Sequence, residues 1–232
     1  MAHVLLLHGL GGTGRTMQPL ADGLIAHGHV VHAPTLPGHG TAAEALDHVG
    51  WADWLEAALA WPANTGPDVV GPDVVRADVV RPDVVVGQSM GGSLALAVAA
   101  RNGCRAVVAI NPPAADLDAV DGLEWRRSRG HHWVDGPPLA EGEDGYTSLP
   151  ISALLQMAIG VAATDLGAVQ VPLLLVTSAH DDVVDPAGAD LIATSVAGPV
   201  ARLVLEHSGH VATLGPDLAV LTAAIADFVA RA

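Results

Sequence analysis

The chain has 232 residues, which favours one globular domain, and half of its residues are hydrophobic, so a sizeable core can be buried. Ten basic residues, all of them Arg, oppose 25 Asp and Glu residues and give a formal net charge of −15. This balance excludes a general nucleic-acid binder, because neutralising phosphates needs a basic face. The lack of Lys excludes a Walker lysine and a lysine Schiff base. The single cysteine, Cys104, excludes an internal disulfide and is expected to be buried.

No segment predicts export or membrane insertion. The first apolar run, Val4–Leu7, is short and follows no basic residues, unlike a secretory signal peptide. No uninterrupted apolar stretch reaches the length of a membrane helix. We therefore expect a cytoplasmic protein with no stable membrane insertion, and the sequence gives no prediction of its oligomeric state.

Short Val- and Leu-rich runs alternate with longer Ala- and Leu-rich runs along the chain. The short runs are continuously apolar, as in parallel strands that are covered on both faces. In chain order the runs predict strand His3–Leu7, helix Thr16–Ala26, strand His29–Ala33, helix Trp51–Ala60, strand Asp83–Val86, helix Gly91–Arg101, strands Ala106–Ile110 and Leu173–Thr177, helix Pro186–Val196, strand Ala201–Leu205 and helix Pro216–Ala230. This order predicts an α/β fold, a mostly parallel sheet of about six to seven strands flanked by helices.

Two segments interrupt the alternation. Residues 66–85 are four pentapeptides, GPDVV, GPDVV, RADVV and RPDVV. They are too few for a solenoid and too rich in proline for a helix, so we interpret the first three as an expanded surface loop, over about residues 64–82, and the last as the strand itself. The segment 112–170 is too long for a plain crossover between strands. It predicts a small cap, helical near Pro150–Ala162, inserted into a single domain, 1–232.

A strand–turn–helix signal lies at Gly87–Gly91, which reads Gly-Gln-Ser-Met-Gly between a predicted strand and a predicted helix. Such a turn strains the backbone of the serine and exposes its hydroxyl above the sheet, and the two glycines relieve the crowding around it. Ser89 is therefore the predicted nucleophile. The alternative is a glycine-rich helix start without chemistry.

A serine needs a base to take its proton, and the chain offers 12 histidines. His210 lies in the loop after the last predicted strand, at the sheet edge where Ser89 lies, and Gly209 gives this loop conformational freedom. The alternative, His207, directly abuts the strand end. His210 is therefore the predicted base.

A carboxylate must orient that histidine and offset its positive charge after proton transfer. The loop after strand Leu173–Thr177 holds three acids. Asp185 precedes a proline and is placed to cap the next helix. Asp181 is the predicted acid because it lies nearer the strand end than Asp182, which remains the alternative.

The loop His8–Gly12 (His-Gly-Leu-Gly-Gly) follows the first strand directly. The amide of Leu10, between glycines, and the amide of Met90, at a helix start, are predicted to bind the oxyanion of a tetrahedral intermediate. A dinucleotide phosphate is the alternative ligand, because the glycines up to Gly14 fit G-x-G-x-x-G. No acidic residue ends the second strand, as that alternative requires.

These motifs, together with Pro37–Gly40 (Pro-Gly-His-Gly), His180–Val184 and Ser208–His210, resemble those of the α/β-hydrolase superfamily over nearly the whole chain. Within it, the chain is most similar to small bacterial carboxylesterases and monoacylglycerol lipases with a minimal cap. The resemblance implies a catalytic triad and two oxyanion-hole amides: Ser89, Asp181 and His210, with Leu10 and Met90. We expect no cofactor and no metal, since the pair His131 and His132 has no further ligands nearby.

The predicted reaction is hydrolysis of short- to medium-chain carboxylic esters through an acyl-enzyme on Ser89. Monoacylglycerols and thioesters are alternative substrates, and a C–C bond hydrolase or a cofactor-free perhydrolase would use the same triad. An alternative of another class is a non-catalytic receptor or scaffold, which would lack a triad member.

The predicted cap carries a cluster of three arginines, Arg126, Arg127 and Arg129. We interpret it as solvated surface, with recognition of an acidic substrate group as the alternative. Two cap tryptophans, Trp125 and Trp133, are expected to line an acyl pocket or to pack the cap. Three others are spaced to share one helix face: Trp51, Trp54 and Trp61.

Overall fold

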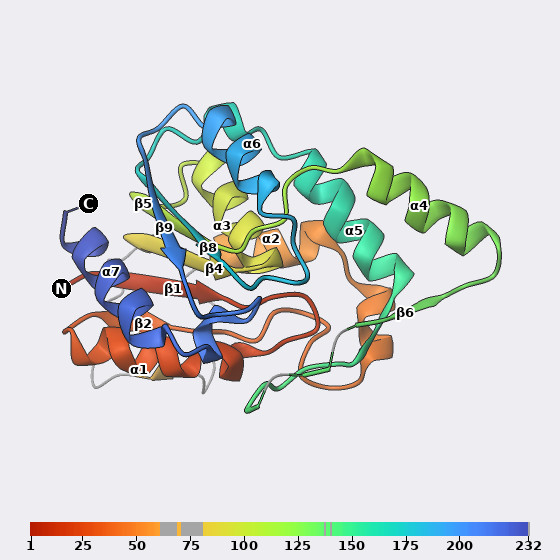
Figure 1. Cartoon of the computed structure of the whole chain (residues 1–232), viewed down its shortest axis with the longest axis horizontal. Coiled ribbons are helices and arrows are strands. Elements are labelled where there is room, and N and C mark those ends of the chain that lie inside the picture. The colour runs from red at the N-terminus through yellow and green to blue at the C-terminus, as the bar shows by residue number, and fades with distance from the viewer. Residues whose placement is uncertain (61–68, 71–80, 137, 140, 232) are drawn as a thin grey trace.

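A computed structural model of the chain describes residues 1–60, 69–70, 81–136, 138–139 and 141–231. Its main sheet has seven strands in the order β3-β2-β1-β4-β5-β8-β9 (Figure 1). The strands from β2 to β9 pair in parallel, whereas β3 pairs antiparallel with β2 at one edge. This confirms the predicted α/β fold.

The strands of the main sheet are β1 (His3–Leu7), β2 (Val30–His32), β3 (Val69–Val70), β4 (Val84–Gln88), β5 (Ala106–Ile110), β8 (Leu173–Ser178) and β9 (Val200–Leu205). The flanking helices are α1 (Gln18–Ala26), α2 (Trp51–Leu59), α3 (Met90–Ala100), α6 (Ala187–Ser195) and α7 (Leu218–Arg231), with a 3₁₀ turn, η2 (Ala43–His48), before α2. The elements predicted by hydrophobic pattern are present, with ends shifted by a residue or two.

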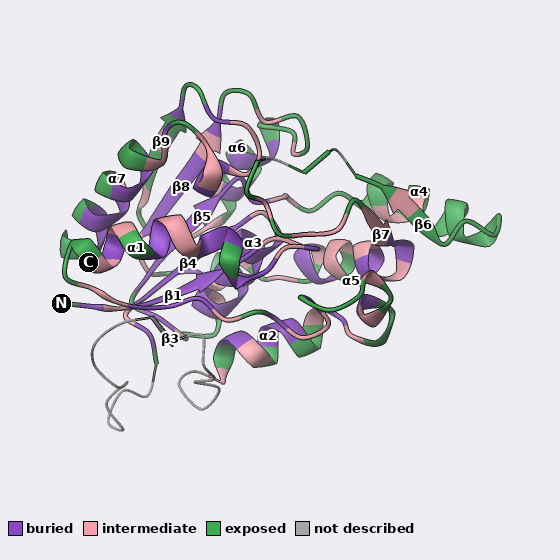
Figure 2. Cartoon of the chain, turned by 90° about the horizontal axis from the view of Figure 1, so that it is seen from below, coloured by how far each residue is buried: buried purple, intermediate pink, exposed green. Residues whose placement is uncertain are grey.

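Side chains alternate between the two faces of the sheet and build two hydrophobic cores. On β1, Leu5 and Leu7 pack toward α2, α3 and α6, whereas Val4 and Leu6 pack toward α1 and α7. Figure 2 shows the buried strands between these helices. Helix α3 is buried from its first residue nearly to its end, which explains its composition of Gly, Ala and other apolar residues.

The segment between β5 and β8 holds α4 (Leu117–Ser128), β6 (Trp133–Asp135), β7 (Ser148–Pro150) and α5 (Ile151–Ala162), and it projects to one side of the sheet (Figure 1). Helix α5 lies where the helical part of the cap was predicted. Helix α4 was not predicted, because it buries no residue and so has no apolar periodicity. The sequence feature that marks the start of α4 is its N-cap residue, Asp116, whose carboxylate accepts a hydrogen bond of 3.0 Å from the amide of Ala119.

Helix α5 is held against the body of the protein at a close helix contact. A Cβ atom on Gly160 would lie 2.0 Å from Cγ of Trp51, so only glycine admits this approach of α5 to α2. Trp54 is fully buried and donates its indole N–H to the carbonyl of Pro37 at 3.0 Å. Trp61 lies outside the described residues.

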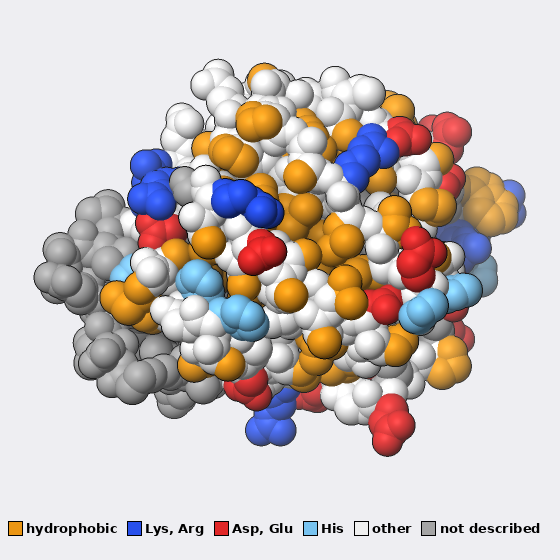
Figure 3. Space-filling view, turned by 60° about the vertical axis from the view of Figure 1, so that its left-hand side comes forward, with side chains coloured by type: hydrophobic (Ala, Val, Ile, Leu, Met, Phe, Trp, Pro, Cys, Tyr) orange, Lys and Arg blue, Asp and Glu red, His pale blue; other side chains and the backbone are white. Residues whose placement is uncertain are grey.

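The charged side chains of the cap helix α4 face solvent. The three cap arginines are exposed, and Arg129 lies over the ring of Trp125 at 5.4 Å. On the face seen in Figure 3, basic side chains lie beside acidic ones and are scattered among hydrophobic ones. The ion pair of Arg202 with Asp190 is of this exposed kind, whereas Asp83 in the pair with Arg105 is half-buried. These positions match the interpretation of the cap arginines as solvated surface.

The pentapeptide repeat lies largely outside the described residues, apart from two points. Val69 and Val70 of the first copy pair with β2 as strand β3, so the prediction of a loop for the first copy is wrong there. The edge of β2 presents free backbone hydrogen-bonding groups, which accept a short added strand. The last copy contributes Val84 and Val85 to β4, as predicted.

Among the described helices, none is long and apolar enough to cross a membrane.

Candidate active site

Ser89 lies in a strained turn between β4 and α3. Its backbone has φ 56° and ψ −122°, in the region of positive φ that residues other than glycine rarely adopt. Its amide donates a hydrogen bond of 2.8 Å to the carbonyl of Ile110, which ties the turn to the end of β5. The serine side chain is therefore presented at the carboxyl edge of the sheet, as the sequence predicted.

The glycines around Ser89 are required by close backbone contacts. A Cβ atom on Gly91 would lie 2.1 Å from the carbonyl oxygen of Leu7, at the end of β1. A Cβ atom on Gly9 would lie 3.2 Å from Cβ of Ser89, so the loop after β1 passes directly beside the serine. Leu10, whose amide was predicted to form an oxyanion hole with that of Met90, therefore follows a residue that lies against Ser89.

A buried histidine fixes the loop that carries Leu10. Nε2 of His8 accepts a hydrogen bond of 2.9 Å from the amide of Leu36, so its proton lies on Nδ1, which donates to the carbonyl of Gly9 at 2.8 Å. Burial, together with the neighbouring ring of His39, lowers the pKa of His8 to about 3. His8 therefore stays neutral and acts as a structural tie rather than as a base.

The structure brings Asp181 and His210 together. Nδ1 of His210 lies 3.0 Å from each carboxylate oxygen of Asp181, and both side chains are largely buried. Burial alone would raise the pKa of Asp181, but hydrogen bonds from His210 and from the amides of Val184 and Val183 outweigh it and leave the pKa below its usual value. The carboxylate is therefore charged when it faces the imidazole. Among the described residues, the ring of His210 is hydrogen-bonded to Asp181 and not to Oγ of Ser89, a contact that in free enzymes is often long and tightens when substrate binds.

The alternative residues lie elsewhere. Asp182 and His207 are exposed. The carboxylate of Asp185 accepts a hydrogen bond of 2.9 Å from the amide of Ala187 at the start of α6, which is the capping contact that the sequence indicated.

Two side chains that the sequence analysis did not assign lie beneath His210. Nε2 of Gln88 and Nδ2 of Asn111 both donate to the backbone carbonyl of His210, at 2.6 and 2.8 Å. The only sequence feature that could have indicated Gln88 and Asn111 is their place at the ends of predicted strands. Gln88 ends β4 and Asn111 follows β5, so both lie at the carboxyl edge where Ser89 lies.

The β6–β7 hairpin packs on the loop that carries Leu10. The amide of Tyr146 donates a hydrogen bond of 3.1 Å to the carbonyl of Gly11, and a Cβ atom on Gly11 would lie 2.8 Å from the side chain of Leu149. The hydroxyl of Tyr146 accepts a hydrogen bond of 3.1 Å from the amide of Thr41. The segment between β5 and β8 therefore supports the predicted oxyanion loop directly.

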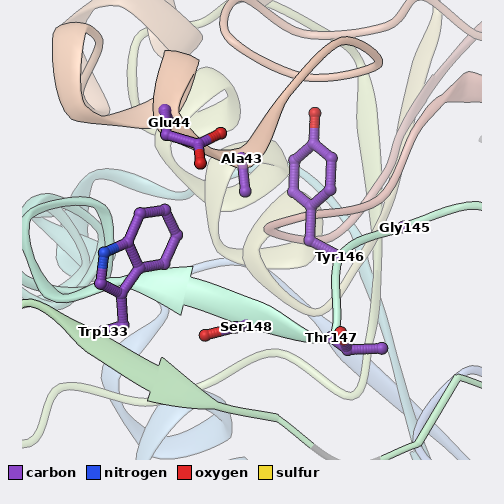
Figure 4. Close-up of a pocket in the computed structure, with 7 residues that line it drawn as sticks. All are labelled: Ala43, Glu44, Trp133, Gly145, Tyr146, Thr147 and Ser148. Atoms are coloured by element: carbon purple, nitrogen blue, oxygen red, sulfur yellow. The ribbon is translucent and has the colours of Figure 1, made fainter.

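An open pocket of about 430 Å³ lies between this hairpin and η2 (Figure 4). Its lining includes Glu44 from η2, and Trp133, Tyr146 and Ser148 from the hairpin region. Side chains alternate along a strand, so Ser148 points to the face opposite Leu149, which contacts the oxyanion loop. Tyr146 lines this pocket and also contacts Gly11, so the pocket lies beside the loop that carries Leu10.

The described residues contain no group of His, Cys, Asp and Glu side chains that could hold a metal ion. The structure brings together a serine in a strained turn and a hydrogen-bonded Asp–His pair at one edge of the sheet. A parallel sheet that presents a strained serine after one strand and an Asp–His pair after two later strands defines the class of α/β hydrolases.

The chain belongs to the alpha/beta hydrolase family, whose model matches residues 4–223. It is 30% identical over 239 residues to a thermostable monoacylglycerol lipase of Bacillus sp. strain H-257, covering 98% of this chain and 90% of that protein. It is 25% identical over 222 residues to a carboxylesterase of Bacillus subtilis strain 168, covering 92% and 86%. These relatives are an esterase and a lipase.

Solved structures show the same fold. A chain from the study of LipS and LipT, two metagenome-derived lipolytic enzymes, superposes with a TM-score of 0.82 at 27% identity, covering 99% of this chain and 94% of that one. A monoacylglycerol lipase of Paleococcus ferrophilus superposes with a TM-score of 0.70 at 16% identity, covering 98% and 93%. At 16% identity, the similarity to the Paleococcus ferrophilus enzyme shows a shared fold and no more.

Proposed function

We propose that the protein hydrolyses carboxylic esters, with Ser89, Asp181 and His210 as its catalytic triad and the amides of Leu10 and Met90 as its oxyanion hole. The observation that carries this proposal is the hydrogen bond between His210 and Asp181, at the sheet edge where Ser89 is held in a strained turn.

Proton transfer in this proposal follows from the hydrogen bonds of His210. Because Nδ1 faces Asp181, Nε2 is the nitrogen left to take the proton of Ser89 as its oxygen attacks the acyl carbon. Asp181 stays ionised, since its pKa is lowered, and stabilises the imidazolium that forms. The imidazolium then protonates the leaving alcohol, and water repeats the sequence on the acyl-enzyme to release the acid and regenerate Ser89.

The negative oxygen of each tetrahedral intermediate is stabilised by two amides in this proposal. Met90 is the first residue of α3, where free amides and the helix dipole favour negative charge. Leu10 lies in a turn closed by a hydrogen bond of 3.1 Å from the amide of Gly12 to the carbonyl of Gly9. A preformed turn of this kind needs no reorganisation when charge develops.

We propose short- to medium-chain acyl esters as the substrates, because the segment proposed as the cap, 112–170, is short and brings few large aromatic side chains to the site. The second candidate is a monoacylglycerol lipase, favoured by the 30% identity over nearly the whole chain to an enzyme of that name.

Active-site labelling tests the proposal. A fluorophosphonate should label Ser89, identified by mass spectrometry, and Ser89→Ala should lower ester hydrolysis by about 10⁴- to 10⁶-fold without loss of fold. A series of p-nitrophenyl esters, monoacylglycerols, long-chain triglycerides and acyl-coenzyme A, compared by kcat/KM, then separates the candidate substrates. Near-normal turnover in a folded Ser89→Ala protein would contradict the nucleophile, and highest kcat/KM for long-chain triglycerides would contradict the substrate class.

A further inference from the structure

The strand order places the proposed base far from the proposed nucleophile. Ser89 follows β4, Asp181 follows β8 and His210 follows β9, and the order across the sheet is β4-β5-β8-β9. Neighbouring strands lie about 4.8 Å apart, so the ends of β4 and β9 are separated by roughly 14 Å. A loop that ran straight on from β9 would hold His210 beyond the acid. The loop must turn back over the ends of β8 and β5 to bring His210 toward Ser89.

The carbonyl oxygen of His210 accepts hydrogen bonds from two buried side chains at the ends of β4 and β5. Gln88, the last residue of β4, donates to it at 2.6 Å, and Asn111, the residue after β5, donates to it at 2.8 Å. The two donors are 2% and 3% exposed, so water competes little for these hydrogen bonds. They hold the backbone of His210 itself, at the end of the loop that turns back.

The amide of Asn111 can take only one orientation. Its Oδ1 accepts a hydrogen bond of 2.8 Å from the backbone amide of Ser178, which can only donate, and its Nδ2 faces the carbonyl of His210, which can only accept. Ser178 ends β8, just before the loop that holds Asp181. One side chain therefore joins the loop of the acid to the loop of the base.

The backbone of Asn111 is also adapted to this position. Its φ is 46°, a left-handed conformation that asparagine tolerates better than most residues, and its amide donates to the carbonyl of Val176 at 2.9 Å. The side chain thus leaves the end of β5 in a fixed direction, beneath the returning loop.

A second set of hydrogen bonds holds the other end of the same loop. The carboxylate of Asp217 accepts from the amide of His207 at 2.8 Å and from Oγ of Ser208 at 3.0 Å. These contacts fix the loop where it leaves β9. They do not reach over β4. The carbonyl of His210 also accepts a hydrogen bond of 3.0 Å from the amide of Ala212 within the same loop, so the bonds that tie its backbone to the ends of β4 and β5 are those from Gln88 and Asn111.

We propose that Asn111, assisted by Gln88, is a positioning residue that holds His210 within reach of Ser89 and in register with Asp181. This inference rests on the proposed function. It assigns to Asn111 no contact with substrate, because its amide is committed to Ser178 and His210.

Two substitutions of Asn111 separate its amide from its backbone. Asn111→Gly removes the amide and suits the positive φ, and Asn111→Asp keeps the shape and the acceptor while losing the donor. Asn102→Gly is the matched control, because Asn102 is an exposed asparagine with φ 56°. Both Asn111 variants should lower kcat by about 10²-fold while KM changes little, as expected when a catalytic group is misplaced by about 1 Å. Asn102→Gly should have the parent kcat.

Adding Gln88→Met tests whether the two donors act together. If both hold the same carbonyl, Gln88→Met combined with Asn111→Gly should lower kcat by less than the product of the two single effects, because the loop is already released. Independent, multiplicative effects would contradict a shared role on His210.

A spectroscopic signal distinguishes positioning from mere stability. The proton on Nδ1 of His210, hydrogen-bonded to Asp181, should give a far-downfield NMR resonance, which Asn111→Gly should shift or broaden and Asn102→Gly should leave unchanged. If Asn111→Gly lowers the melting temperature but keeps both this resonance and kcat at low temperature, the residue is only structural and the inference is wrong.

Fluorophosphonate labelling separates this inference from the proposed function. A parent protein that is not labelled at Ser89 contradicts the proposed function. A parent that is labelled at Ser89, with Asn111→Gly labelled at the same rate, contradicts only the positioning role. The expected result is fast labelling of the parent and of Asn102→Gly, and slow labelling of Asn111→Gly.

Discussion

Gly87 and Gly91 face each other across the turn at Ser89 so closely that a Cβ atom on Gly87 would lie 1.9 Å from the carbonyl oxygen of Gly91. This contact shows that the turn is built on backbone packing, with no room for a side chain at either position. The strained backbone conformation of Ser89 persists because the tightly packed residues around it leave no alternative. The position of the serine side chain therefore depends on the stability of the whole turn.

Replacing one of these glycines should therefore disrupt both stability and the site. We expect Gly87→Ala to lower the free energy of unfolding by roughly 2 to 4 kcal/mol, because the new methyl group meets backbone rather than a movable side chain. Urea unfolding measures this change. The control is Gly122→Ala in α4, where an added Cβ atom meets nothing within 4 Å and should leave stability equal or slightly higher. Parent-like stability of Gly87→Ala would contradict the tight turn.

The two adjacent acids after β8 should differ sharply in their effect on ester hydrolysis. Asp181→Asn removes the charged partner of His210 and should lower kcat by about 10⁴-fold, since the histidine is then held in the wrong tautomer. Asp182→Asn changes an exposed carboxylate and should leave kcat near the parent value. Initial rates on one aryl ester decide between them. The opposite ranking would assign the acid to Asp182.

Activity should rise as the pH is raised from the acid side, because only a neutral imidazole accepts the serine proton. Asp181 is already ionised near neutral pH, since hydrogen bonds outweigh its burial and lower its pKa. The hydrogen bonds of Asp181 also make the stability of the fold depend on pH, and this contribution is present at high pH and absent at low pH. Asp181 stabilises the fold above the carboxylate value of about 3.9, and this contribution is lost as the pH falls through its lowered pKa.

Two measurements check this pH dependence. The pH profile of kcat/KM should show one ascending limb on its acid side, and a rate that falls there as the pH rises would contradict His210 as the base. Acid unfolding of Asp181→Asn should show a weaker dependence on pH than that of the parent, with Asp182→Asn as its control.

Part of the pentapeptide repeat should be dispensable for catalysis. Deleting residues 71–80 removes two copies and keeps Val69 and Val70, which pair with β2. The repeat enters β4 at Val84, whereas Ser89 follows the opposite end of that strand, so we expect an unchanged kcat/KM. Loss of activity in a deletion variant that keeps its circular dichroism spectrum would indicate that the repeat reaches the site.

The local sequence determined much of this protein. Continuous Val and Leu runs predict buried parallel strands wherever they occur, and Gly87–Gly91 indicates a strained serine from five adjacent residues. Position after a strand made Asp181 and His210 candidates, because the carboxyl ends of parallel strands meet at one edge, and Gly209 favoured His210 over His207. In the structure these two residues are hydrogen-bonded to each other. Their spacing in the sequence could not predict that distance.

Only the tertiary structure decided the features that have no local pattern. Helix α4 buries no face, and β3 exists through its pairing with β2, so neither produces an apolar period of its own. The hydrogen bonds from Gln88 and Asn111 to His210 span 122 and 99 residues of chain. They form because β4 and β5 lie next to each other while β9 lies at the sheet edge and its loop must return across them. Hydrophobic periodicity predicts that strands exist, but the order in which they pair is set by packing of the whole sheet, and that order places these two side chains beneath the histidine.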